Sequence, residues 1–162
     1  MGYNNCMPDT APYSLADTWR LNNRVNLMLL DSLSEEQLAH VPSPRARSLA
    51  DQFAHLHNVR IMWLEVQAPA AAKTLRKIEK GAAAKKALRE ALDGSAEAFA
   101  TMLEAAERAG KMKAQKRGIY AFFGYAIAHE GHHRGQIIVH LKHAGMPVDR
   151  TLGFGLWEWE KI

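Results

Sequence analysis

The sequence has little cysteine and no long apolar run. A single cysteine, Cys6, among 162 residues excludes an internal disulfide framework and a cysteine-based zinc site, and it fits a reducing compartment. No window approaches the roughly 18 consecutive apolar residues of a membrane span. The first 16 residues lack the apolar core of a signal peptide, because polar residues and the prolines Pro8 and Pro12 interrupt them. We therefore expect a cytoplasmic protein without a membrane segment.

The composition is otherwise that of an ordinary globular protein. An apolar share of 48% and a charged share of 23% argue against a disordered or fibrous chain, and the length predicts a single domain over residues 1–162. A net charge of +4 is too small to predict nucleic-acid binding. The eight histidines are the unusual feature. Their positions decide what chemistry the chain can perform.

Apolar residues recur at helical spacing in four long stretches, and no strand-like alternation lasts beyond a few residues. We predict helices over residues 14–32, 48–67, 83–109 and 119–145, with a short helical turn after Ser34. Ser14 and Ser48 stand at N-cap positions, with Asp17 and Asp51 placed to complete capping boxes. Four amphipathic helices in one small domain predict an all-α fold, a four-helix bundle.

We predict that the remaining segments are the connections between the helices and the two ends of the chain. Residues 68–81 are rich in alanine and lysine and contain Pro69, so they predict a partly ordered connection long enough to cross over the bundle. Residues 110–118 predict a solvated loop. We expect an irregular N-terminus over residues 1–13 and a docked tail over residues 146–162, because the tail is rich in aromatic residues.

Histidines on two predicted helices could meet at one metal ion. His129 and His133 are four residues apart, about 40° around a helix axis, so their imidazoles can converge. His132 points roughly 60° to the other side of His129 and is the less favoured partner. A third ligand could come from His55 or His57, between which periodicity does not choose. Three imidazoles would leave a coordination position open to water or substrate, as in reactive metal sites.

Several other polar or aromatic residues could have either a functional or a purely structural role. Gln136 could orient a ligand or water, or could make an ordinary polar core contact. Glu130 and Arg134 face away from the line of His129 and His133 and are predicted to be surface or interface charges. Residues 129–133 also fit the letters His-Glu-x-x-His, but the surrounding peptidase architecture is missing. The four tryptophans are predicted to pack in the core and tail.

A run of basic residues between positions 73 and 89 is predicted to form a solvated face. It could also steer an acidic thiol or another anion toward a site. Its members are Lys73, Arg76, Lys77, Lys80, Lys85, Lys86 and Arg89.

Four segments together resemble the DinB/YfiT-like superfamily, and the resemblance covers nearly the whole chain. They are AHEGHHRGQ (128–136), IIVHLKHAGMP (137–147), GLWEW (155–159) and SLADQFAHL (48–56). The resemblance implies a four-helix bundle of up-down-down-up topology and a homodimer. It also implies a damage-inducible family of metal-dependent enzymes.

By this resemblance the metal ligands are His55, His129 and His133, with nickel or zinc as the ion. The family pattern favours His55 because its metal histidine follows the capping serine by seven positions, as His55 follows Ser48. An acidic residue often stands five positions after that histidine, whereas this chain has Arg60 there. Relatives use bacillithiol, mycothiol or glutathione, so the resemblance implies activation of a low-molecular-weight thiol.

Three functional hypotheses follow from the sequence. The first is a metal-dependent enzyme, a thiol S-transferase or a hydrolase, that activates a thiol or water at the three histidines. The second is a non-catalytic metal-binding stress-response protein of the same fold. The third is a nucleic-acid-associated protein, which the small net charge does not favour. The sequence alone assigns no catalytic residue.

Overall fold

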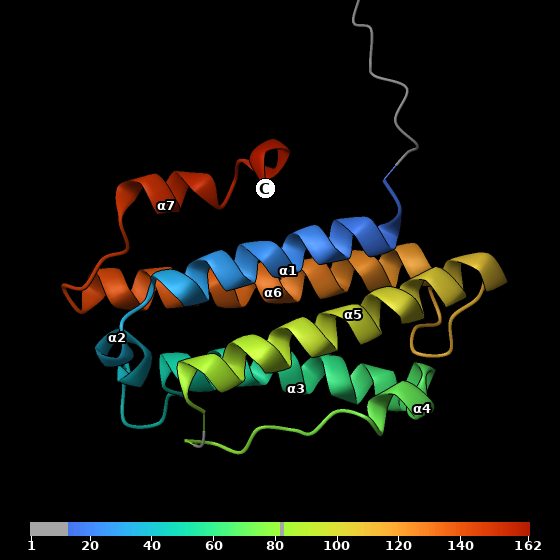
Figure 1. Ribbon diagram of the computed structural model, residues 1–162, viewed down its shortest axis with the longest axis horizontal. Helices are drawn as coiled ribbons and strands as arrows, with labels where there is room; N and C mark the ends of the chain where they lie inside the picture. Colours follow the sequence, from blue (N-terminus) through green and yellow to red (C-terminus); the bar gives the residue numbers. More distant parts are fainter. Residues whose placement is uncertain (1–12, 82) are drawn as a thin grey trace, which may run out of the picture.

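The computed structural model describes residues 13–81 and 83–162, and these residues form helices and no strand (Figure 1). The all-α prediction is confirmed, and the four long helices lie close to their predicted bounds. The N-terminal segment predicted to be irregular lies, apart from Tyr13, outside the described residues. The elements are α1 (Leu15–Ser32), α2 (Glu35–Ala39), α3 (Leu49–Gln67), α4 (Pro69–Ala72), α5 (Lys85–Ala109), α6 (Ile119–His143), α7 (Arg150–Gly155) and the 3-10 helix η1 (Trp159–Lys161).

The connection between α3 and α5 contains α4 and then runs back along α3 (Figure 1). The backbone N–H of Ile78 donates to Oδ1 of Asn58 at 2.9 Å, and that of Gly81 donates to Oδ1 of Asp51 at 2.7 Å. Later residues of the connection thus pair with earlier residues of α3. As a result α5 begins near the end of the bundle where α3 begins, and both helices run in one direction while α1 and α6 run in the other.

Local capping explains where the helices begin and end. The Ser14 capping box is complete, since Oγ of Ser14 accepts from the N–H of Asp17 and the Asp17 carboxylate accepts from Ser14. At Ser48 only half of the predicted box forms. The Oγ accepts from the N–H of Asp51 at 3.0 Å, but the Asp51 carboxylate accepts from Gly81 instead of from Ser48. The Asp51 carboxylate, which the local spacing predicts to accept from Ser48, thus binds the connection between α3 and α5 instead.

The C-terminus of α6 is closed by Gly145, as the sequence predicts. Gly145 has a φ of 73°, in the left-handed region where a side chain is disfavoured. The N–H of Met146 donates to the carbonyl of Leu141 at 2.9 Å, and that of Gly145 donates to Lys142 at 3.2 Å. These two bonds form a Schellman motif, which turns the chain toward α7.

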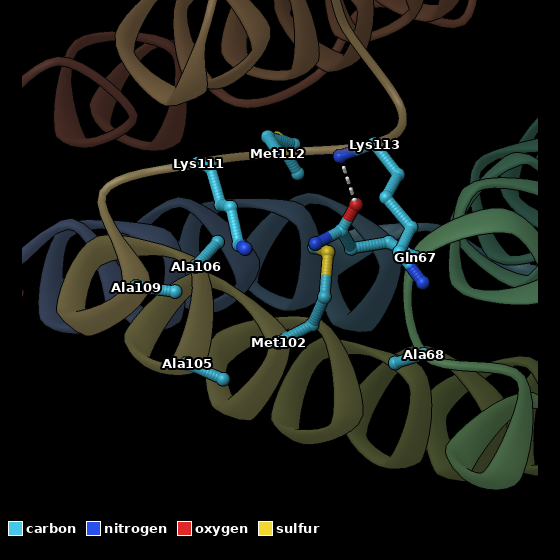
Figure 2. Close-up of a pocket in the computed structure, with 9 residues that line it drawn as sticks. All are labelled: Gln67, Ala68, Met102, Ala105, Ala106, Ala109, Lys111, Met112 and Lys113. Atoms are coloured by element: carbon cyan, nitrogen blue, oxygen red, sulfur yellow. Dashed lines mark hydrogen bonds between the residues drawn. The ribbon is translucent and has the colours of Figure 1, made fainter.

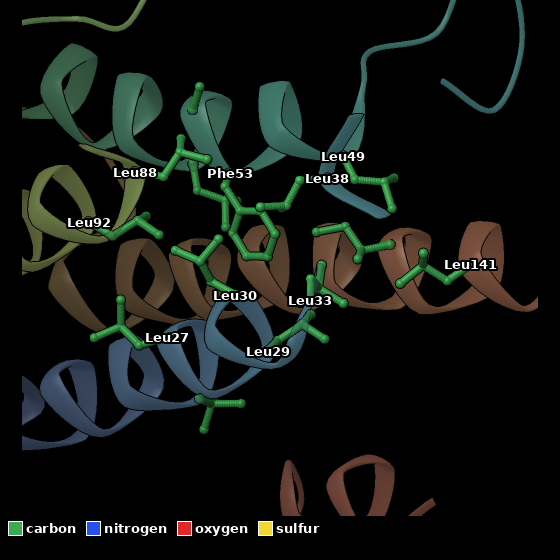
Figure 3. Close-up of a cluster of buried hydrophobic side chains, with 14 of the residues drawn as sticks. Leu27, Leu29, Leu30, Leu33, Leu38, Leu49, Phe53, Leu88, Leu92 and Leu141 are labelled. Carbon is green, nitrogen blue, oxygen red and sulfur yellow. The ribbon is translucent and has the colours of Figure 1, made fainter. Parts of the chain in front are cut away.

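The core consists of two clusters along the bundle. Leucine side chains from α1, α3, α5 and α6 meet around Phe53 in the first cluster (Figure 3). In the second, the Trp19 ring stacks on Phe99 with ring centroids 4.3 Å apart, and Phe122 lies against Phe99 at 5.6 Å. The two clusters use the apolar stripes of all four long helices. The three histidines described below come together where α3 faces α6.

The segment after α6 packs on the bundle through α7 and η1 (Figure 1). Leu156 is buried and Trp159 is partly buried against the first core cluster. The packing predicted for Trp157 is wrong, because this side chain is 83% exposed. Consecutive residues of a short helical tail point in different directions, so only part of its aromatic content can face the bundle. Among the helices described, none combines enough length and apolarity to span a membrane.

Candidate metal centre

Three histidines from α3 and α6 converge at one point. One ring nitrogen from each of His55, His129 and His133 lies within 4.8 Å of the corresponding nitrogens of the other two. The ring centroids are 5.4 Å apart for His55 and His129, 4.8 Å for His55 and His133, and 4.7 Å for His129 and His133. Such a group can donate three nitrogen ligands to one ion.

The convergence arises from two helical stripes that face each other. On α6, His129, His133 and Gln136 follow one another by four and three residues, so they share one side of the helix. On α3, Gln52 and His55 are three residues apart and share the side turned toward α6, because Gln52 contacts His133 and the His55 ring contacts both histidines of α6. Neither helix alone could assemble the group.

The two rival histidines have other surroundings. Nε2 of His57 donates a hydrogen bond to the carbonyl of Arg76 at 2.9 Å, and the His57 side chain is buried against the connection after α4. His132 is exposed to solvent. Its ring lies 5.3 Å from that of His133, but it is not part of the converging group. The structure thus brings together the three histidines named by the resemblance and places His57 and His132 elsewhere.

The surroundings of the triad favour neutral imidazoles. Burial lowers the pKa of His55 to about 4, with the Arg47 guanidinium and His129 acting in the same direction. Burial also lowers the pKa of His133 to about 4, assisted by His129 and His55. The pKa of His129 is lowered by burial, against the opposing effect of Glu130. A neutral imidazole has the free lone pair that a metal ion requires.

Gln52 is a neighbour of the triad that sequence reasoning missed. Its side chain is 5% exposed, and Oε1 lies 3.4 Å from Nδ1 of His133. An acceptor at this nitrogen holds the proton on Nδ1 and leaves Nε2 free as a ligand atom. Gln136, the residue chosen from the sequence, lines the adjacent cavity. Gln52 stands three residues before His55, and this spacing alone would have placed both side chains on one face of the helix.

The prediction that Glu130 is a surface or interface charge is wrong, whereas Arg134 is half-buried. Glu130 is 2% exposed, and its Oε2 accepts from Nδ2 of Asn22 at 2.6 Å and from Nδ2 of Asn26 at 2.7 Å. Arg134 donates to Oδ1 of Asn26 at 2.6 Å. The side of α6 that carries Glu130 and Arg134, next to the histidine side, faces α1, whose asparagines supply these partners. Helical periodicity correctly predicts that Glu130 points away from the histidines. It does not predict which helices pack against Glu130.

Arg60 carries the positive charge that compensates Glu130. Its Nε donates to Oε1 of Glu130 at 2.7 Å, and its Nη2 donates to Oε2 at 3.0 Å, so the pair is bidentate. Nη1 donates to the Leu92 carbonyl at 2.8 Å and to Oδ1 of Asn23 at 3.0 Å. Burial alone would raise the pKa of Glu130, but the charge and hydrogen bonds of Arg60, together with Asn26 and Arg134, outweigh burial and lower the pKa. The basic residue that departs from the family pattern is therefore the partner of a buried carboxylate.

Two cavities flank the triad and open to the surface. One, of about 520 Å³, is lined by His133 and Gln136, and the other, of about 290 Å³, is lined by His55 and Asn58. On the side of His129, the Tyr125 ring stacks at 6.0 Å and contacts Trp63 at 5.7 Å. The triad can therefore be approached from solvent on the side of His55 and His133.

A separate apolar hollow lies between the end of α3, the end of α5 and the loop that follows α5 (Figure 2). It measures about 300 Å³ and is lined mainly by alanine and methionine side chains, with Lys111 and Lys113 at one side. The backbone N–H of Lys113 donates to Oε1 of Gln67 at 2.7 Å. No histidine lines it, and Gln67 is about 18 Å of helix rise beyond His55. This hollow is distinct from the triad.

Comparisons with known proteins give one match. The sequence model of the DinB superfamily matches residues 18–137, a range that includes all three histidines. No curated protein and no solved structure matches the chain.

Proposed function

The chain belongs to the DinB superfamily, and from that membership and the geometry of its histidines we propose that it is a metal-dependent enzyme. Its divalent ion would be held by His55, His129 and His133. The observation that carries the proposal is the approach of three ring nitrogens, from two helices, to within 4.8 Å of one another. A His-x-x-x-His pair that occurred on α6 by chance would not be expected to have a third histidine, from another helix, beside it.

The donor set suits an ion of borderline softness. Imidazole nitrogens favour nickel and zinc over calcium or magnesium, which prefer oxygen ligands. No carboxylate belongs to the converging group, so the three donors are neutral and the charge of the ion is not cancelled by its ligands. Nickel or zinc is therefore the expected ion.

The chemistry proposed is activation of a low-molecular-weight thiol or of water. A divalent ion at the triad would lower the pKa of such a group by placing positive charge beside it. The chain itself supplies the rest. Gln52 orients His133, the buried pair of Arg60 and Glu130 joins α3 to α6, and the open cavities admit a small substrate. Thiol S-transfer and hydrolysis are the two reaction classes that fit this arrangement.

A second candidate function is metal binding without catalysis, in a stress-response role. One observation favours it: among the described residues that line the two cavities, the one carboxylate is Asp51, in the smaller cavity, and its Oδ1 already accepts from the N–H of Gly81. Among the described lining residues, the one carboxylate that could serve as a general base is thus already engaged through one of its oxygens. A homodimer, a thiol cosubstrate and a cytoplasmic location stay predictions.

The test begins with metal analysis of protein purified without a histidine tag. We expect one nickel or zinc ion per chain, lost in His55→Ala, His129→Ala and His133→Ala and kept in His132→Ala. His132 is the matched control because it neighbours His133 but is exposed. Failure of the wild-type protein to bind either ion would reject the proposal.

A thiol-conjugation screen then separates the two candidate functions. Conjugation of bacillithiol, mycothiol or glutathione to an electrophile should depend on the metal and stop when the metal is chelated. Full metal occupancy with no turnover of any thiol, and no hydrolysis, would favour the non-catalytic function.

A further inference from the structure

The two cavities beside the triad share two basic side chains. Arg47 and Lys80 line both the cavity that contains His133 and the one that contains His55. Arg45 lines the larger cavity as well. The arginines come from the loop before α3, and Lys80 comes from the connection before α5. Two segments distant in sequence therefore bring positive charge to the same edge of the candidate metal centre.

Three residues of the basic run between positions 73 and 89 have partners away from the cavities. Lys77 pairs with Glu65 at 2.8 Å, Arg89 pairs with Asp31, and Nζ of Lys85 donates to the carbonyl of Leu33 at 2.6 Å. Within residues 13–81 and 83–162, no ion pair involves Arg45, Arg47 or Lys80. Lys80 is the member of the run that lines the two cavities beside the triad.

Little negative charge opposes these groups. Among the described residues that line the two cavities, the one carboxylate is Asp51, in the smaller cavity. It is 7% exposed, and its Oδ1 accepts from the N–H of Gly81. Three cationic side chains therefore face one carboxylate that is already hydrogen bonded.

The other end of the site has the opposite character. Tyr125 and Trp63 lie beside His129, with the Tyr125 ring stacked on the imidazole at 6.0 Å. A ligand with one charged and one uncharged part would therefore have a single favourable orientation. Its anionic group would lie at the basic edge, in the cavities lined by His55 and His133, and its uncharged part would lie away from Arg47 and Lys80.

We propose that the site selects small ligands that carry a carboxylate or phosphate, held by Arg47 and Lys80 while the reactive group lies at the triad. This inference rests on the proposed metal-dependent function and specifies its substrate class. Arginine can bind such a group through two parallel hydrogen bonds, and lysine acts as a point charge. Because the cations are exposed, their effect should weaken at high salt.

The test compares three thiols of similar size by titration calorimetry of zinc-loaded protein. They are 3-mercaptopropionate, which is anionic, 2-mercaptoethanol, which is neutral, and cysteamine, which is cationic. We expect the anionic thiol to bind at least about tenfold more tightly than the neutral one, a difference of about 1.4 kcal/mol. Arg47→Ala and Lys80→Ala should each remove most of this preference and leave the affinity for 2-mercaptoethanol unchanged. Lys113→Ala, a lysine outside the cavities, is the control.

A metal-free arm separates this inference from the proposed function. The metal-free protein is titrated with inorganic phosphate and with acetate, and the preferred anion identifies which of the two groups the subsite takes. Binding should weaken in Arg47→Ala and in Lys80→Ala but not in Lys113→Ala. If metal binds but the three thiols have equal affinity, the anionic subsite is rejected while the metal function stands. If no metal binds, the proposed function is rejected, and absence of anion binding to the metal-free protein then rejects the subsite too.

Discussion

The guanidinium of Arg60 and the carboxylate of Glu130 form a bidentate pair in the interior, with each residue 2% exposed. Arg60 follows His55 by five residues on α3, and Glu130 directly follows His129 on α6. The pair therefore connects the two helices that carry the triad, close to the histidines themselves. Its geometry fixes how one ligand-bearing helix lies against the other.

Breaking this pair should destabilise the protein strongly. Glu130→Gln leaves the Arg60 charge buried without a counter-charge, so we expect the free energy of unfolding to fall by about 3–5 kcal/mol. Urea denaturation of metal-free protein measures the loss. The control is Glu97→Gln, because Glu97 pairs with Arg20 on the surface, with side chains 62% and 31% exposed. That change should cost at most about 1 kcal/mol. Equal losses in the two variants would contradict a structural role for the buried pair.

Removing Gln52 should weaken metal binding without removing a ligand. Because Oε1 of Gln52 lies 3.4 Å from Nδ1 of His133, we expect Gln52→Ala to raise the dissociation constant for zinc about 10- to 100-fold. Competition with a chelator measures this constant. Gln136→Ala is the matched control, since Gln136 lines the cavity. A larger effect in Gln136→Ala than in Gln52→Ala would show that the sequence-based choice was the better one.

The metal-free protein should lose stability as the pH falls from about 6.5 to about 4. The pKa of His55 and of His133 is about 4 in the folded protein, whereas an unperturbed histidine, as in the unfolded chain, has a pKa of 6.5. The unfolded chain therefore binds more protons between these two pH values. Protonation therefore favours unfolding, and the stability present above pH 6.5 declines progressively on acidification. Urea denaturation at several pH values measures the slope.

A double variant isolates the contribution of the two histidines to this slope. In His55→Gln, His133→Gln the decline between pH 6.5 and 4 should become shallower, while His132→Gln should follow the wild-type curve because His132 is exposed. An unchanged slope in the double variant would mean that other groups, such as Glu130 with its lowered pKa, cause the acid sensitivity.

Two glycines of the α6 region should respond to alanine in opposite directions. Gly145 has a φ of 73°, so Gly145→Ala forces a side chain into left-handed backbone and should cost about 1 kcal/mol. Gly124 lies inside α6 with nothing within 4 Å of an added Cβ, so Gly124→Ala should stabilise by about 0.5–1 kcal/mol. Thermal and urea denaturation of both variants measure the difference. A loss of stability in Gly124→Ala would contradict this prediction, because it would mean that the added methyl group meets atoms outside the single chain.

Local sequence signals predicted the helices well because helix ends depend on residues close in the chain. Ser48 and Gly145 stand where the structure begins α3 and ends α6. The pairing of His129 with His133 is local too, since a separation of four residues places both on one face of any helix. The half-formed box at Ser48 shows the limit. Asp51 accepts from Gly81, thirty residues away, which no local pattern contains.

What the sequence by itself determined is therefore the set of helices and the two histidines that share a face of one of them. The tertiary structure decided the rest of the site: that His55 and not His57 meets them, that Gln52 contacts His133, and that Glu130 is buried against Arg60. The physical reason is that periodicity fixes angles around a single helix axis. Which side of α3 faces α6, and what covers the side of α6 that carries Glu130, depend on how four helices pack against one another.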